Sequence, residues 1–293
     1  MDLAYLRAHP QHLPTFLTHQ RLRETPVSGG HVCTASRLTL DDGSSVFAKT
    51  WPSGTAPEGF FATEAAGLRW LADAGSVPVP EVLVALPDML AMEWIEPGEP
   101  SPEAAERLGR DLAGTHRAGA DTFGADRPGF IGPLPLDNTP SAGPWGAWFA
   151  ERRLLPYLRS SADRGALSVD DVAAVERIIN TIERYGGSEP PARTHGDLWS
   201  GNVLWAADGR ARLIDPAAHG GHRETDLAAL ALFGGAPHLD RILAAYQEAY
   251  PLADGWRQRV PLHQLHLLLV HTASFGAAYS GAVRTAADAI RPG

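Results

Sequence analysis

Three oxygen-bearing side chains are spaced so that they could meet at one point in the folded chain. Asp197 and Asn202 lie close together, and Asp215 follows them after two short apolar runs. The pair Asp208-Gly209 separates these runs, which predicts a β-hairpin. Because a hairpin returns the chain to its starting point, we expect Asp197, Asn202 and Asp215 to converge.

Two carboxylates and an amide in one place suit Mg²⁺, which prefers carboxylates together with phosphate oxygens. His195-Gly196-Asp197 with Asn202 downstream also fits the phosphoryl-transfer pattern, in which one Asp stays off the metal and accepts a proton from a hydroxyl group. A polar turn with a capping Asp would explain this loop alone. It would not explain Asp215 at hairpin distance, so we favour a catalytic site.

A lysine and a glutamate near the N-terminus are placed to form a pair. Lys49 ends a predicted strand, and a helix predicted over Glu58–Leu71 puts Glu64 on its apolar face. A buried carboxylate needs a partner, and the Lys–Glu pair of kinases is the precedent. Alternatively, Glu64 lies at the edge of this face and meets solvent.

A glycine pair, Gly29-Gly30, precedes an alternating run that predicts a strand. Such a turn can expose backbone N–H groups to a phosphate, although most glycine pairs are ordinary turns. Cys33 lies just beyond it. Nearby N–H groups would favour its thiolate and make it oxidisable, whereas the alternative is a small residue packed against the sheet.

The segment 96–102 is rich in Glu and Pro and separates two regions of different character. Residues 1–95 contain most of the predicted strands and form an N-lobe. Residues 96–293 contain an extended loop over 122–133 and are otherwise mostly helical; they form a C-lobe with the catalytic and metal-binding loops. A nucleotide would lie in the cleft between such lobes.

Composition narrows the class of protein. The 293 residues are 44% hydrophobic and 20% charged, which is typical of a globular protein. The net charge of -9 argues against nucleic acid or an anionic membrane as a partner. Cys33 is the single cysteine, so an internal disulfide is excluded. The N-terminus lacks a signal-peptide pattern, and the apolar stretch 262–283 is interrupted by histidines; we expect a cytoplasmic protein.

At Gly29, Lys49, Glu64, Asp215 and the loop 195–202, the chain resembles the aminoglycoside-phosphotransferase-like branch of the protein-kinase fold. In finer detail it resembles the fructosamine (ketosamine) kinase family over about residues 20–282. The motifs behind this resemblance are His195-Gly196-Asp197-Leu198-Trp199-Ser200-Gly201-Asn202, Ile214-Asp215-Pro216-Ala217, Gly221-His222-Arg223-Glu224, Leu232-Phe233-Gly234-Gly235, Phe130-Ile131-Gly132 with Asn138, and Trp145 with Phe149, Glu151 and Arg152.

Two positions, His31 and His219-Gly220, depart from the family pattern. These departures bear on the preferred substrate and not on the class of reaction.

The resemblance implies an α+β, two-lobed protein-kinase-like fold with a small antiparallel-sheet N-lobe and a larger, mostly helical C-lobe. It implies ATP and Mg²⁺ as cofactors and a ketosamine, such as fructosamine or ribulosamine, as the acceptor. Asp197 would deprotonate the acceptor hydroxyl (O3′ in the family), and Asn202 and Asp215 would hold Mg²⁺. Asp226 would brace the catalytic loop.

The remaining expected contacts involve the nucleotide and the acceptor. Lys49, held by Glu64, would contact the phosphates, and the phosphate-binding turn would be Gly29-Gly30. The adenine would meet the backbone of Glu93, Trp94 and Ile95. Trp199 and Glu224 would contact the acceptor, with the Trp199 ring as a platform for the sugar; alternatively, this ring fills the core beneath the loop.

Three other functions compete with a ketosamine kinase. Gly196 replaces the Arg of regulated protein kinases, and Asp215 and Asp226 lie too close for a long activation segment. These features favour a small acceptor, which could also be an aminoglycoside, an amino alcohol or a plain sugar.

A metal-dependent hydrolase is the second alternative, and a nucleotide-binding pseudokinase is the third. Glycated protein lysines are further potential acceptors, and the oligomeric state is open.

The hydrolase would use His195, Asp197, His219 and His222 as metal ligands. It would leave Lys49 and Glu64 without a role. A pseudokinase would bind ATP without turnover, but no expected catalytic position is missing.

Overall fold

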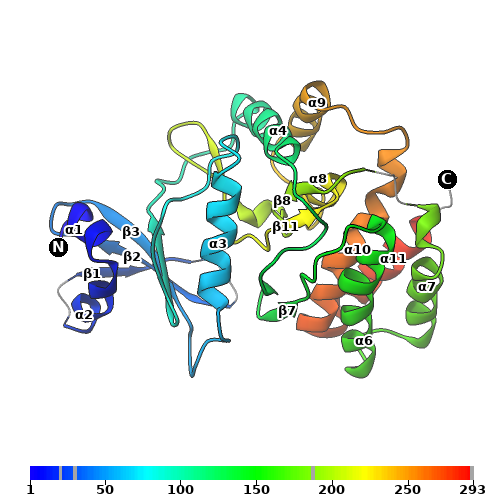
Figure 1. Cartoon of the computed structure of the whole chain (residues 1–293), viewed down its shortest axis with the longest axis horizontal. Helices are drawn as coiled ribbons and strands as arrows, with labels where there is room; N and C mark the ends of the chain where they lie inside the picture. Colours follow the sequence, from blue (N-terminus) through cyan, green and yellow to red (C-terminus); the bar gives the residue numbers. More distant parts are fainter. Residues whose placement is uncertain (20–21, 29–31, 186–188, 291–293) are drawn as a thin grey trace.

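A five-stranded antiparallel sheet forms the first part of the chain in the computed structural model, which describes all residues except 20–21, 29–31, 186–188 and 291–293. The strand order is β1-β2-β3-β5-β4. Figure 1 shows the sheet with α3 on the side facing the rest of the chain. The strands are β1 (Arg23–Pro26), β2 (Thr34–Thr39), β3 (Ser45–Thr50), β4 (Val82–Leu86) and β5 (Met89–Glu93).

The alternation of side chains along the strands buries both faces of this sheet. Val46 and Ala48 of β3 pack on the face covered by α1 (Leu3–Ala8) and α2 (Leu13–Thr18). Phe47 points to the opposite face, which is covered by α3 (Phe60–Ala72). Since side chains on one face recur every second residue, Lys49 also lies on the α3 face. This places its ammonium group opposite Glu64 of α3.

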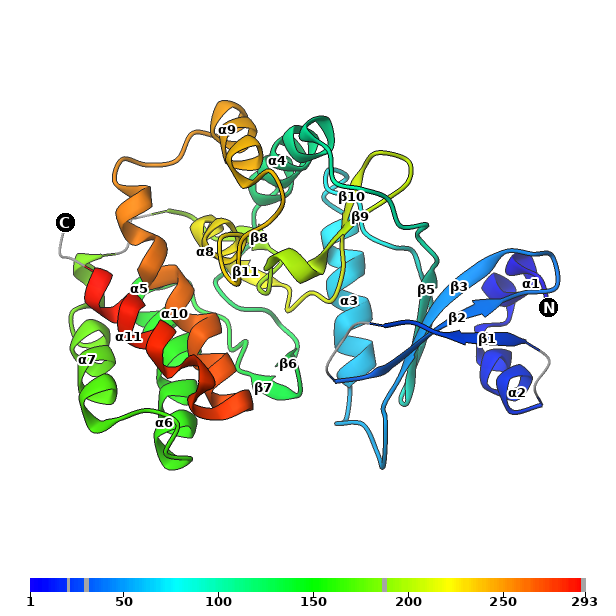
Figure 2. The ribbon, with the colours of Figure 1, turned by 180° about the vertical axis from the view of Figure 1, so that it is seen from behind.

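Helices dominate the rest of the chain (Figures 1 and 2). They are α4 (Pro102–Arg117), α5 (Trp145–Phe149), α6 (Leu155–Asp163), α7 (Val169–Ile179), α8 (Arg223–Ala229), α9 (Leu239–Ala249), α10 (Trp256–Phe275) and α11 (Ser280–Ala289), with the 3₁₀ turn η5 (Gly276–Tyr279) between the last two. Two large apolar cores hold them together: one around α10, the other between α4 and α9. In the described part of the chain, no helix is long and apolar enough to cross a membrane.

The predicted hairpin after the catalytic loop is present. Its strands are β9 (Val203–Trp205) and β10 (Ala211–Leu213), paired antiparallel with Leu213 opposite Val203. Gly209 has φ 73°, which the turn requires. A second short pair, β8 (Ala192–Thr194) with β11 (His219–Gly221), joins the segments before and after the site.

Two local features differ from the sequence-based expectation. The extended loop over 122–133 contains β6 (Gly129–Ile131), which pairs with β7 (Leu134–Leu136); three-residue strands are too short to show a periodicity. The helix expected from Trp145 is interrupted by a π-helical segment, Ala150–Leu154. Pro156 follows this segment and has no N–H to donate to the preceding turn, which accounts for the interruption.

Candidate active site

The catalytic loop brings Asp197 and Asn202 into direct contact. The Asn202 amide nitrogen lies 2.7 Å from the Asp197 carbonyl oxygen and 3.3 Å from its carboxylate Oδ2. Asn202 is buried, and its backbone carbonyl accepts a hydrogen bond from the Ile214 N–H at 3.1 Å. This last bond ties the loop to the residue before Asp215, so the hairpin closes the site as predicted.

Asp215 meets the lysine–glutamate pair of the N-lobe. The Lys49 Nζ lies 2.5 Å from Glu64 Oε1 and 2.9 Å from Asp215 Oδ1. Burial alone would lower the pKa of Lys49, but the two carboxylates outweigh it and hold this pKa above its usual value. Lys49 is therefore a fixed positive charge at the junction of the two lobes.

The backbone of Asp215 is in the left-handed region, with φ 54°. Such a conformation is uncommon for residues other than glycine and is concentrated at functional sites. Its carboxylate is partly exposed, at 44%. The strained turn thus keeps one carboxylate oxygen on Lys49 and leaves the group accessible from solvent.

Asp226 braces the catalytic loop from beneath. Its carboxylate is buried and accepts hydrogen bonds from the backbone N–H groups of His195 (2.7 Å) and Gly196 (2.9 Å). The ring of His116 lies 3.1 Å from the same group and 2.8 Å from the Tyr246 hydroxyl. The bracing role expected for Asp226 matches these contacts. His116 and Tyr246 carried no signal in the sequence, because both are far from the loop along the chain.

Gly196 is required by the packing of the loop. It has φ 82°, and a Cβ atom at this position would lie 2.3 Å from the Ala217 carbonyl oxygen. No side chain fits there. The glycine that distinguishes this loop from the H-R-D pattern is therefore needed for the loop to approach the segment after Asp215.

The electrostatic surroundings of Asp197 suit a proton acceptor. Burial raises its pKa to about 8, and the negative charge of Asp215 adds to this effect, while the hydrogen bond from Asn202 opposes it. A general base is most effective when its pKa is near the working pH. Asp197 thus binds a proton more readily than an exposed carboxylate does.

Asn202 and Asp215 offer a donor set that fits Mg²⁺. The Asn202 amide nitrogen is engaged with Asp197, so its carbonyl oxygen is the atom left to act as a ligand. Asp215 contributes carboxylate oxygen. Oxygen-only donors in small number match Mg²⁺, which completes its shell with water and phosphate oxygens.

The two residues expected to contact the acceptor, Trp199 and Glu224, differ in their exposure to solvent. Trp199 is partly exposed; its ring packs over Gly201 and lies 6.0 Å from the ring of Phe233. Glu224 is buried and forms a double ion pair with Arg259, at 2.6 and 2.8 Å. The structure does not open the Glu224 carboxylate to a ligand.

The structure describes Glu93, Trp94 and Ile95, the three residues expected to meet the adenine. Glu93 ends β5, and Trp94 and Ile95 follow it toward the second lobe. The Trp94 ring stacks against Arg37, whose guanidinium carbon lies 4.5 Å from the ring centre. Gly29 and Gly30 lie outside the described residues.

Of the two alternatives for Cys33, the structure favours a residue packed against the sheet. Burial raises the pKa of its thiol to about 11, although the nearby Lys49 charge acts in the opposite direction. The side chain packs with the apolar residues between the sheet and α3. Desolvation disfavours the thiolate, so Cys33 is a packing residue at neutral pH.

The metal site postulated for a hydrolase is not formed. The Nε2 atom of His195 lies 2.9 Å from the Ile214 carbonyl oxygen, and its Nδ1 atom accepts a hydrogen bond from the Asp197 N–H at 3.3 Å. His219 Nδ1 lies 2.7 Å from the Ala217 carbonyl oxygen. Backbone groups therefore hold these two rings, which leaves no common point at which His195, Asp197 and His219 could bind one ion.

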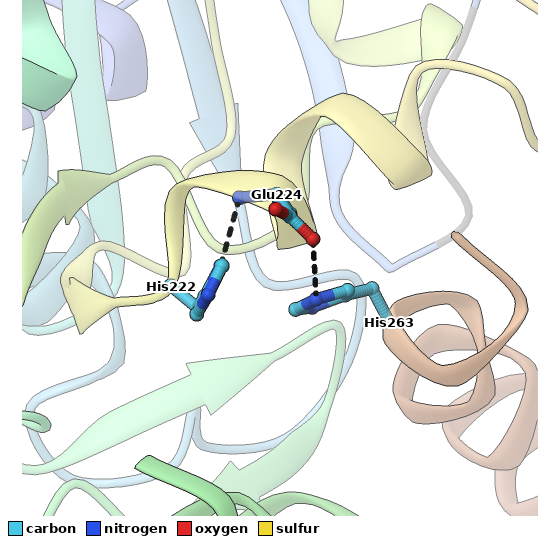
Figure 3. A group of neighbouring side chains, drawn as sticks. All are labelled: His222, Glu224 and His263. Carbon is cyan, nitrogen blue, oxygen red and sulfur yellow. Dashed lines mark hydrogen bonds and ion pairs between the residues drawn. The ribbon is translucent and has the colours of Figure 1, made fainter. Parts of the chain in front are cut away.

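A different cluster, His222, Glu224 and His263, has ligand-type atoms within 4.8 Å of one another (Figure 3). His222 Nδ1 accepts the Glu224 N–H at 3.2 Å and caps α8. The carboxylate is already neutralised by Arg259, and His263 lies 3.3 Å from it. A cation would compete with the guanidinium for the same oxygens, so the cluster is a buried ion-pair network.

Known proteins resemble this chain over most of its length. The family model described as fructosamine kinase matches residues 9–291. The chain belongs to the fructosamine kinase family. It is 40% identical to a probable ketoamine kinase of Thermus thermophilus, over 80% of this chain and 83% of that protein.

Solved structures extend the comparison to the fold. A candidate fructosamine-3-kinase from Thermobifida fusca is 52% identical, with TM-score 0.86, over 92% of this chain and 93% of the other. An aminoglycoside phosphotransferase bound to ADP and hygromycin B is only 14% identical, with TM-score 0.63 over 95% and 97% of the two chains, so it shows the fold alone. The two-lobed, α+β protein-kinase-like fold is confirmed. As a member of a kinase family, the chain is a phosphotransferase that uses ATP.

Proposed function

We propose that this enzyme transfers the γ-phosphate of ATP to a sugar hydroxyl, O3′, of ketosamines such as fructosamine and ribulosamine. Such a reaction would serve to remove sugars from glycated amines. The observation that carries the proposal is the convergence of Lys49, Glu64, Asp197, Asn202 and Asp215 in a chain of the fructosamine kinase family.

The two lobes have separate tasks in this proposal. The N-lobe, residues 1–95, holds the nucleotide: Lys49 binds the phosphates, Gly29-Gly30 cradles them, and the backbone of Glu93–Ile95 receives the adenine. The C-lobe, residues 96–293, holds the acceptor and the catalytic loop. The ion pair between Lys49 and Asp215 supports this division, because it joins the lobes at the position that we propose for the phosphates.

The chemical step follows from the contacts of Asp197. Its carboxylate accepts the proton of the acceptor hydroxyl as the oxygen bonds to phosphorus and the bond from phosphorus to ADP breaks. Lys49 stabilises the negative charge on the phosphates. Mg²⁺ held by Asn202 and Asp215 would neutralise further charge. Trp199, two residues after Asp197, offers its ring to the C–H face of the sugar.

A kinase of the same fold for another small acceptor is the alternative. Structural neighbours include aminoglycoside and macrolide phosphotransferases and a choline kinase. They are 10 to 17% identical to this chain, far below the 52% of the fructosamine-3-kinase homologue. The ketosamine is therefore the favoured acceptor. Lysines of glycated proteins are larger examples of the same chemistry, and a cytoplasmic location stays a prediction.

The decisive experiment is a phosphate-transfer screen with Mg·ATP and matched acceptors. We expect turnover of ribulosamine and fructosamine, and NMR of the product should place phosphorus on O3. Turnover of an aminoglycoside or an amino alcohol, with none for either ketosamine, would assign the alternative function. Omitting Mg²⁺ should abolish the reaction, which tests the metal separately.

A further inference from the structure

Aromatic side chains continue from the catalytic loop across the surface of the C-lobe. Neighbouring rings have centroids 4.5 to 6.0 Å apart. We call this set the aromatic wall; it consists of Trp199, Phe233, His271, Phe275 and Tyr279. Trp199 is the member nearest to Asp197 in sequence, and its ring contacts Phe233 edge to face. The wall therefore begins at the residue proposed to support the sugar.

Two members of the wall are exposed although they are apolar. Phe233 is 38% exposed and Phe275 is 51% exposed. Among the described residues, only two other large hydrophobic side chains, Tyr5 and Val169, are exposed to this degree. Single exposed apolar residues are ordinary, but contiguous ones mark binding sites. The position of this patch beside the catalytic loop points to the acceptor as its ligand.

The backbone at Phe233 is strained. Its φ is 53°, in the left-handed region that bulky residues seldom adopt, and Gly234 and Gly235 follow with φ 95° and 78°. The turn after α8 therefore directs the Phe233 side chain outward from a backbone conformation that glycine would adopt without strain. Strain of this kind persists where a function uses the side chain that it presents.

The last turn of α10 and the turn after it supply the other rings. His271 Nδ1 donates to the Leu267 carbonyl oxygen at 2.8 Å, which fixes the orientation of that ring. Phe275 and Tyr279 flank it at 5.5 and 4.9 Å. In both views of the ribbon, this end of α10 lies on the side of the C-lobe turned toward the N-lobe (Figures 1 and 2).

We propose that the aromatic wall binds the substituent on the amine nitrogen of the ketosamine and favours aromatic and large apolar amines. The inference rests on the proposed function. In a ketosamine the amine is attached to C1, a short distance along the carbon chain from the O3 hydroxyl. With that hydroxyl at Asp197 and the sugar on Trp199, the amine substituent comes next, at Phe233 and then Phe275. The ring faces also attract the secondary ammonium group.

The test uses two acceptors that share one sugar and differ only in the amine: the fructose adducts of glycine and of phenylalanine. Wild type should have the lower KM for the phenylalanine adduct. Phe233→Ala and Phe275→Ala should each reduce this preference about fivefold or more, with kcat and the KM for ATP unchanged. Phe275→Leu, which keeps an apolar side chain of similar bulk, should restore part of the preference. Tyr5→Ala removes an equally exposed aromatic on the N-lobe and should change nothing.

The outcomes separate the two proposals. No turnover by wild type of either adduct, or of the ribulose adducts of the same two amines, overturns the proposed function and this inference with it. Turnover without a preference for the phenylalanine adduct, or a preference that both alanine variants retain, overturns only the inference. A shift in sedimentation of the variants, with unchanged KM values, would identify the wall as a contact between copies of the chain and would also overturn it.

Discussion

The proposed role of Asp197 as a base depends on the residues around it. An isolated aspartate is a weak base, but burial and the charge of Asp215 raise its pKa to about 8. Asn202 holds the carboxylate in place with a hydrogen-bond contact of 3.3 Å. These contacts supply both the orientation and the proton affinity that a general base needs.

Replacing Asp197 should separate binding from chemistry. Asp197→Asn keeps the shape of the side chain but cannot accept the proton, so kcat should fall by roughly 10²- to 10⁴-fold. Nucleotide affinity should be unchanged, since Lys49 and Glu64 are untouched. Steady-state kinetics and nucleotide titration measure the two effects. Asp208→Asn, in the exposed hairpin turn, is the matched control; a near-normal kcat for Asp197→Asn would remove this residue as the base.

Asp215 should control the metal. Asp215→Asn tolerates the left-handed backbone, because Asn adopts that conformation readily, but it removes a charged ligand. We expect the Mg²⁺ concentration for half-maximal activity to rise about tenfold or more, with activity partly restored by added Mg²⁺. If the Mg²⁺ dependence is the same as in wild type, Asp215 is not a ligand.

The rate at which Cys33 is alkylated at different pH values should report the burial of its thiol. Its thiol pKa is raised to about 11, so the thiolate is rare at neutral pH and increases only as the pH approaches that value. Between pH 7 and 9, alkylation by iodoacetamide should stay well below that of a free peptide thiol. Mass spectrometry follows the reaction, and Cys33→Ser gives the background. Alkylation as fast as that of the peptide thiol would mean that the thiol is not desolvated.

Among the secondary-structure elements, α3 positions the lysine that we propose binds the phosphates. The helix buries Phe61, Ala65 and Leu68 against the sheet, and Glu64 on the same side reaches Lys49. The sheet contributes the lysine from β3, and the C-lobe contributes Asp215 from the turn after β10. Three separate elements thus fix one ammonium group.

Breaking the ion pair between Lys49 and Glu64 should affect both ATP binding and the stability of the protein. Glu64→Gln removes one of the two carboxylates around the buried Lys49 charge, which should cost about 1–3 kcal/mol of stability and raise the KM for ATP at least several-fold. The KM for the acceptor should change less. Thermal unfolding and kinetics measure both effects. Glu58→Gln, just before the same helix and exposed, is the control; identical behaviour of the two variants would argue against the pair.

At the scale of the whole molecule, α3 also sets the distance between the lobes. Gly67 faces the segment after Asp215, where an added Cβ would lie 3.3 Å from the Ala218 Cβ and 3.5 Å from Pro216 Cγ. Phe60 at the start of α3 meets Phe130 of β6, with ring centres 5.2 Å apart. α3 is therefore one of the elements along which the lobes touch, and the Lys49–Asp215 contact depends on how closely it approaches.

A larger residue at Gly67 should push the lobes apart. Gly67→Val places methyl groups where the C-lobe already lies, so we expect a loss of about 1–3 kcal/mol of stability and a clear fall in kcat/KM for ATP. Gly281→Val is the matched control, because an added Cβ at this helical glycine meets nothing within 4 Å. Calorimetry and kinetics of the two variants should differ; equal values would show that the approach of α3 is not critical.

The sequence determined the elements and the local motifs. Alternation along β3, the apolar stripe of α3 and the turn at Asp208-Gly209 are local patterns, and each produced the predicted strand, helix or hairpin. Because the hairpin joins the catalytic loop to Asp215, even their convergence followed from spacing. Pairing of Lys49 with Glu64 was also predictable, since a buried charge requires a partner.

The tertiary structure decided what depends on distant packing. The burial that raises the pKa of Cys33, the ion pair that encloses Glu224, and the support of Asp226 by His116 involve residues far apart in sequence. The aromatic wall likewise joins the catalytic loop, the turn after α8 and the end of α10. Solvation and charge act through space, so the state of a side chain depends on neighbours that only the folded chain supplies.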